Sequence, residues 1–138
     1  MSRRGIFHHS VRHALEKEGW IVTDDPLKID WGGATIKIDL GAERLLAAER
    51  EGDKIAVEIK SFAGSSPISE FHTALGQFIG YRRVLRDKEP SRKLFLSVPI
   101  DAYEEFLATE YAQSLIEEQS VAFIVYHPIH EVIVEWKK

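Results

Sequence analysis

The stretch at residues 54–62, KIAVEIKSF, places a carboxylate and an amine two residues apart on a segment that alternates between apolar and polar residues. Because successive side chains of a strand point to opposite faces, Glu58 and Lys60 share one face. Three branched apolar residues share the other face: Ile55, Val57 and Ile59. Two interpretations are open: an ordinary solvated strand face, or half of a metal site that needs a second carboxylate.

A candidate for the second carboxylate is Asp39, in the alternating segment at residues 35–40 (TIKIDL). If this strand neighbours the later one, Asp39 and Glu58 meet on one side of a sheet. Mg²⁺ prefers oxygen ligands and typically takes one or two carboxylates, which leaves positions for water and phosphate. A cation held by Asp39 and Glu58 could activate water for phosphodiester hydrolysis, with Lys60 positioning that water and stabilising negative charge.

Gln77 and Tyr81 are one helical turn apart, beside the apolar stripe of the strongest predicted helix. They could lie over the polar side of the sheet. The alternative, which stays open, is a helix shoulder with a satisfied amide and a half-buried tyrosine.

The order of elements predicts a mixed α/β domain with a twisted central sheet. Apolar periodicity and turn residues place the helices at 6–18, 69–87 and 101–118, and the strands at 20–23, 35–40, 45–51, 55–60, 93–98, 121–126 and 132–136. Segment 45–51 (LLAAERE) has helical propensity, but Gly52 and Asp53 and the strong strand behind them favour the first arm of a hairpin.

The composition limits the classes of protein to which this chain can belong. The chain has 138 residues, which fits one domain (1–138), and it is 44% hydrophobic and 29% charged, as in globular proteins. The absence of cysteine excludes disulfides and thiolate chemistry and fits the cytoplasm, and we expect neither a signal peptide nor a membrane span. The net charge of −4 argues against non-specific phosphate binding by the whole surface. Six basic residues within 82–93 are interpreted as the solvated face and exit loop of a helix.

Other titratable groups carry weaker signals. His9, His13 and Glu16 form a stripe on the first helix, and two histidines one turn apart can bind zinc. The spacing differs from the His-Glu-x-x-His pattern of metalloproteases, so a solvated surface is the favoured interpretation. His127 and His130 are expected in a turn between two strands.

The order Asp39, Glu58-x-Lys60 and Gln77-xxx-Tyr81 resembles the PD-(D/E)xK nuclease superfamily, and the last pair is similar to that of its RecB-like branch. No proline precedes Asp39, a departure at the loosest position of that motif. More narrowly, nearly the whole chain resembles the XisH family, the fdxN element excision controlling factors of cyanobacteria. The segments that carry this resemblance include Gly19-Trp20, Trp31-Gly32-Gly33, Asp39 to Glu43, Lys54 to Phe62, Ala74 to Gln77 and Val132 to Trp136.

The resemblance implies a restriction-endonuclease-like (PD-(D/E)xK) core, with a mixed central β-sheet flanked by helices. It implies that Asp39 and Glu58 hold Mg²⁺ or Mn²⁺, that Lys60 positions the water, and that Gln77 and Tyr81 orient the lysine or a phosphate. It also allows Glu16, on the first helix, as an accessory acid near the metal.

The resemblance further implies a role with a site-specific recombinase that excises a DNA element during heterocyst differentiation, beside an XisI-like partner protein. A small domain of this kind often needs a second copy to surround a duplex, so we expect a homo-oligomer or a partner. Two functions stay open: a Mg²⁺-dependent DNA phosphodiesterase, and a non-catalytic DNA- or protein-binding accessory factor on a vestigial nuclease fold.

Overall fold

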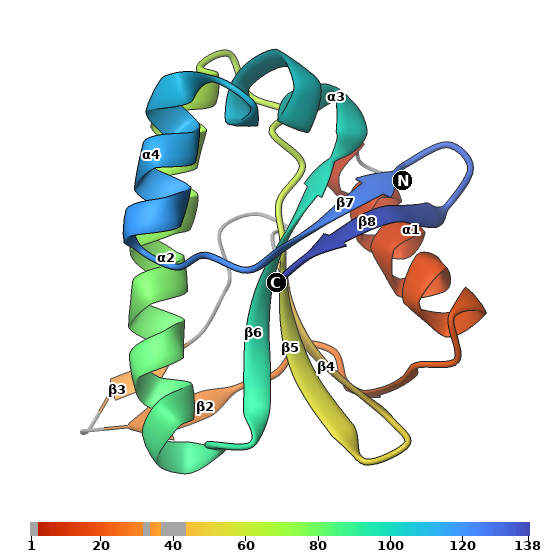
Figure 1. Cartoon of the computed structure of the whole chain (residues 1–138). Helices are drawn as coiled ribbons and strands as arrows, with labels where there is room; N and C mark the ends of the chain where they lie inside the picture. Colours follow the sequence, from red (N-terminus) through yellow and green to blue (C-terminus); the bar gives the residue numbers. More distant parts are fainter. Residues whose placement is uncertain (1–2, 32–33, 37–43) are drawn as a thin grey trace.

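A six-stranded mixed sheet runs through the computed structural model, which describes residues 3–31, 34–36 and 44–138 (Figure 1). In spatial order its strands are β1 (Ile21–Asp24), β4 (Arg44–Arg50), β5 (Asp53–Ile59), β6 (Arg92–Pro99), β7 (Phe123–His127) and β8 (Val132–Lys137). Strands β5, β6 and β7 are parallel, and the outer pairs are antiparallel. A separate antiparallel pair consists of β2 (Ile29–Trp31) and β3 (Ala34–Ile36). The mixed α/β prediction is confirmed.

Helices cover both faces of the sheet. Helix α1 (Arg3–Lys17) lies on one face, and α2 (Pro67–Lys88) lies on the other beside α4 (Glu110–Glu118) (Figure 1). Between β6 and α4 the chain forms a short helix α3 (Ile100–Ala102) and a π-helical turn η1 (Tyr103–Leu107). None of the helices in the described part of the chain combines the length and apolar character that a bilayer crossing requires.

Each face of the sheet has its own apolar core. The core under α2 and α4 contains, among others, Leu45, Ala47, Ala56, Phe71, Phe78, Leu96 and Ile116. The core under α1 contains, among others, Val11, Leu15, Leu46, Val57, Ile59, Phe95 and Tyr126. Successive residues of β4 and β5 fall into opposite cores, as the alternation of a strand requires. The sheet therefore divides the side chains of β5 between α1 and α2.

The segment predicted over 45–51 forms a strand, β4, that ends at Arg50, although its composition favours a helix. β4 pairs with β5 from Arg44 opposite Ile59 to Arg50 opposite Asp53. The two residues of the connection, Glu51 and Gly52, have φ of 50° and 88°, the left-handed values of a type I′ hairpin turn. The tight turn and burial on both faces override helix propensity here.

Two helix predictions need correction. Helix α2 begins at Pro67, two residues before the predicted start, because Ser66 caps it and accepts a hydrogen bond from the Ser69 N–H at 3.3 Å. The single helix predicted over 101–118 is wrong. The chain passes through η1 and restarts at Thr109, whose hydroxyl accepts from the Ala112 N–H at 3.3 Å. A strong N-cap inside an apolar periodic run starts a new helix.

The solvated interpretation of the basic cluster at 82–93 is wrong for Arg92. Its side chain is only 5% exposed, and its guanidinium donates to the Ile55 carbonyl at 2.9 Å and to Glu89 Oε1 at 2.9 Å. A guanidinium has five N–H donors and can satisfy strand-end carbonyls and an acid together. Arg92 therefore ties the start of β6 to β5.

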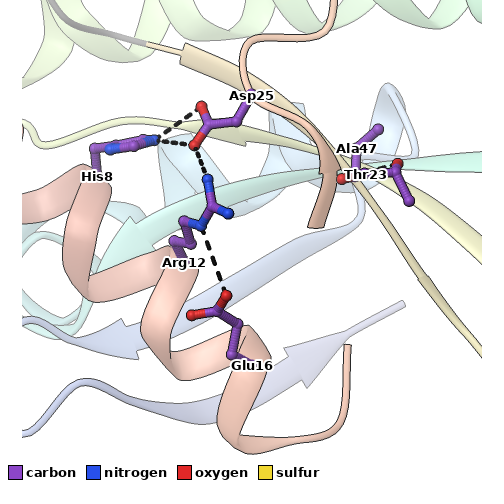
Figure 2. Close-up of polar contacts among 6 residues, drawn as sticks. All are labelled: His8, Arg12, Glu16, Thr23, Asp25 and Ala47. Atoms are coloured by element: carbon purple, nitrogen blue, oxygen red, sulfur yellow. Dashed lines mark hydrogen bonds and ion pairs between the residues drawn. The ribbon is translucent and has the colours of Figure 1, made fainter. Parts of the chain in front are cut away.

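Asp25 connects the end of β1 to helix α1 (Figure 2). Its carboxylate, 8% exposed, accepts from His8 Nε2 at 2.8 Å and from Arg12 Nη1 at 2.8 Å. Arg12 also lies 3.7 Å from Glu16 on the exposed side of the helix. Figure 2 shows these groups as one continuous chain of contacts that fixes α1 against the sheet edge.

We predict that Asp25→Ala lowers the free energy of unfolding by about 2–3 kcal/mol, because it removes charge-assisted bonds to His8 and Arg12 in a poorly hydrated position. Urea unfolding measures the loss. Glu16→Ala is the matched control: it removes only an exposed ion pair of Arg12 and should cost no more than about 0.5 kcal/mol. Equal losses in the two variants would contradict this assignment.

Candidate functional site

The face of β5 that carries Glu58 and Lys60 is buried beneath α2. The side chain of Glu58 is 0% exposed, and Lys60, one residue beyond the end of β5, is 6% exposed. The interpretation as an ordinary solvated strand face is therefore wrong. An ion pair is expensive to bury, so its position inside the protein calls for a specific reason.

Lys60 connects the strand to the helix. Its Nζ donates to Gln77 Oε1 at 2.5 Å and lies 3.7 Å from Glu58 Oε2. Gln77 is half-buried on α2 and its amide oxygen is satisfied by the lysine. The structure thus brings Glu58, Lys60 and Gln77 together, from two elements that the sequence predicted separately.

Tyr81, one turn after Gln77, is buried at 6% exposure in the core under α2. Burial, and then the negative charge of Glu58, raise the pKa of the Tyr81 phenol well above its ordinary value of 10.0. The phenol therefore keeps its proton at physiological pH and can act as a hydrogen-bond donor. Tyr81 thus lies in the core under α2, one helical turn from the Gln77 that contacts Lys60.

The backbone around Glu58 and Lys60 is held from two neighbouring strands. Ser97 Oγ on β6 donates to the Glu58 carbonyl at 3.1 Å, and Tyr126 on β7 donates its hydroxyl to the Lys60 carbonyl at 3.1 Å. These positioning residues were missed in the sequence. Ser97 carried a signal, as a polar residue within the apolar run of β6. Tyr126 carried none, because its partner is 66 residues away.

Asp39 lies outside the described residues. Within the described part of the chain, the strand predicted over 35–40 begins as β3, which ends at Ile36 and pairs with β2. The place beside Glu58 belongs to β4, where Leu45 is the cross-strand partner. In the described part of the chain β3 therefore does not pair with β5, because β4 and β6 are the two strands hydrogen-bonded to β5. Glu16 lies on α1, on the opposite face of the sheet, and contacts Arg12.

The side chains gathered here suit a hard cation with a bound phosphate or water. Glu58 supplies a carboxylate, and Lys60 and Tyr81 supply donors suited to a phosphate or a bound water. Mg²⁺ commonly takes one or two carboxylates and completes its shell with water and substrate oxygens. Of the two carboxylates predicted to hold the metal, the described part of the chain contains Glu58. Asp39 stays a prediction for the second ligand.

The fold and site define a class of protein: a mixed α/β chain with a buried glutamate–lysine pair held beneath a helix. The family model described as XisH protein matches residues 1–134, and the chain belongs to the XisH family.

Two solved structures are similar over almost the full length. One, an XisH family protein from Nostoc punctiforme PCC 73102, is 48% identical, with a TM-score of 0.89, and the match covers 96% of this chain and 99% of that one. The other, an fdxN element excision controlling factor protein from Anabaena variabilis, is 50% identical, with a TM-score of 0.90, covering 97% and 99%. A comparison with curated proteins finds no sequence that matches this chain.

Proposed function

We propose that this chain controls the excision of a DNA element and acts through a Mg²⁺-dependent phosphodiesterase site on a PD-(D/E)xK, restriction-endonuclease-like core. The observation that carries the catalytic part is the buried Glu58–Lys60 pair, held against Gln77. The role in excision is supported by the similar structure described as an fdxN element excision controlling factor.

Energetics support a functional pair. Each buried ion loses several kcal/mol of hydration, of which its partner returns only a part at the 3.7 Å separation of Lys60 Nζ and Glu58 Oε2. An apolar pair of similar volume would pack here at lower cost. Buried ionisable groups that converge with polar side chains are typical of active sites.

In the proposed reaction Glu58 and Asp39 hold the cation, Mg²⁺ or Mn²⁺. The bound cation supplies charge neutralisation on the scissile phosphate and a water of lowered pKa. Lys60 orients the attacking water and stabilises negative charge, and Gln77 holds its ammonium group in place. The protonated Tyr81 phenol donates to a phosphate oxygen at the same site.

The net charge of the chain affects how DNA can reach the proposed site. With 22 acidic and 18 basic residues, the protein gains little from non-specific phosphate contacts. We propose that DNA is brought to the site by a second copy of the chain or by an XisI-like partner within a recombinase system. The same charge balance supports the second candidate function, a non-catalytic accessory factor that binds DNA or protein.

Calorimetric titration of Mg²⁺, and then Mn²⁺, into the protein with a short DNA duplex present tests the site. The duplex supplies the phosphate that such sites often need as a ligand. We expect binding that is lost in the variant carrying Asp39→Ala and Glu58→Ala, since it removes both carboxylates.

The matched control for this titration carries Glu104→Ala and Glu105→Ala, which remove two exposed carboxylates from η1. Its cation affinity should equal that of the wild type. Binding that survives in the first variant, or no binding by the wild type with DNA present, would favour the accessory factor.

A further inference from the structure

A second group of metal-ligand side chains lies on the opposite side of the sheet. His9 and His13 come from α1, and Glu131 comes from the turn between β7 and β8. One ligand atom from each lies within 4.8 Å of the other two. His13 Nδ1 is 2.6 Å from Glu131 Oε1, and His9 Nε2 is 3.5 Å from Glu131 Oε2. The sequence placed His9 and His13 in a stripe with Glu16 and favoured a solvated surface, whereas the acid that the fold brings to the two histidines is Glu131.

The turn that carries Glu131 is fixed against α1 by two further contacts. Ser10 Oγ donates to the Pro128 carbonyl at 2.6 Å, and Lys17 Nζ donates to the His130 carbonyl at 3.0 Å. Glu131 closes the turn with its own N–H, which donates to the His127 carbonyl at 2.8 Å. The carboxylate is thus presented to His9 and His13 by backbone contacts that do not involve either imidazole.

We propose that His9, His13 and Glu131 form a Zn²⁺ site with a water molecule in the fourth position. Tetrahedral Zn²⁺ with ligand bonds near 2.0–2.1 Å separates its ligand atoms by about 3.3 Å. His9 Nε2 lies 3.5 Å from Glu131 Oε2, close to this value. His13 Nδ1 lies 2.6 Å from the other carboxylate oxygen, Oε1, so this separation has to open and one oxygen has to face both imidazoles. Half-exposed side chains can make that adjustment by small rotations.

Ligand chemistry separates this site from the one beneath α2. Two imidazoles and one carboxylate suit Zn²⁺, whereas Mg²⁺ prefers oxygen ligands alone. The proposal uses no residue of the Glu58 site and goes beyond the proposed function.

Binding would connect α1 to the β7–β8 turn, two segments 118 residues apart. Zn²⁺ that binds only the folded chain raises its stability through mass action. We therefore expect both a calorimetric signal and a rise in Tm on addition of Zn²⁺.

The test titrates ZnCl₂ into the full-length wild-type protein, the parent, in buffer with a large excess of Mg²⁺, which occupies the Glu58 site in place of Zn²⁺. We expect one Zn²⁺ per chain, a raised Tm, and no displacement by a large excess of Mg²⁺. Adding Glu131→Gln or His13→Asn should lower Zn²⁺ affinity at least tenfold and remove the rise in Tm. Both side chains are partly exposed, so both variants should fold, which circular dichroism checks.

Glu16→Gln is the matched control, because Glu16 is an acid on the same helix that contacts Arg12. It should keep the affinity and the Tm rise of the parent. Three results would overturn the proposal. They are no Zn²⁺ binding by the parent, undiminished Zn²⁺ binding after His13→Asn, and Zn²⁺ binding that is lost in Glu16→Gln but kept in Glu131→Gln.

Discussion

Lys60→Ala is expected to lower metal-dependent DNA cleavage at least ~100-fold, the usual loss when one preorganised donor is removed from a charge-stabilising site. The variant loses the ammonium group that Gln77 holds beside Glu58. With it go the positioning of water and the stabilisation of negative charge that we propose for Lys60. The measurement is the single-turnover cleavage rate of a DNA substrate with Mg²⁺ or Mn²⁺, with any required partner present.

Lys54→Ala is the matched control, since Lys54 is an exposed lysine of the same strand. It should cleave at the wild-type rate. Circular dichroism and Tm report whether each variant is folded. Wild-type cleavage by folded Lys60→Ala would show that Lys60 has no catalytic role. A wild-type protein with no cleavage under any of these conditions would favour the accessory factor.

The second large effect concerns stability. In metal-free buffer, Glu58→Leu and Lys60→Met should each lower the free energy of unfolding by about 3–5 kcal/mol, because each leaves one buried charge without its partner. The double variant should be as stable as the wild type or more stable by about 1–4 kcal/mol, because no charge stays buried. Urea unfolding of the four proteins gives the double-mutant cycle.

An exposed ion pair on α2 provides the control. Arg83 and Asp87 are 2.9 Å apart and largely solvated, so Arg83→Ala and Asp87→Ala should each change stability by no more than about 0.5 kcal/mol. If the double variant is destabilised by as much as the two single variants together, Glu58 and Lys60 are each needed for the fold, and the argument for a functional pair fails.

The two experiments together separate function from architecture. A pair that is required for cleavage, yet whose apolar replacement leaves stability intact, is maintained for chemistry. A pair that is dispensable for cleavage and needed for stability belongs to the core. Assaying Glu58→Leu, Lys60→Met and the double variant for cleavage as well as for stability gives both outcomes for the same pair.

Local periodicity determined much of this protein. Alternation along residues 55–60 correctly placed Glu58 and Lys60 on one face of a strand, and helical spacing correctly placed Gln77 and Tyr81 on one face of α2. The order of helices and strands predicted the mixed α/β class. These inferences need only the geometry of a single element, which the sequence contains.

Contacts between distant segments were decided by the tertiary structure. The sequence could not tell whether the Glu58 face was solvated, because that depends on α2 packing over it. It named Glu16 beside His13, whereas the fold brings Glu131 there from the far end of the chain. Periodicity specifies which side chains share a face, but the packing of the whole chain selects which element covers that face.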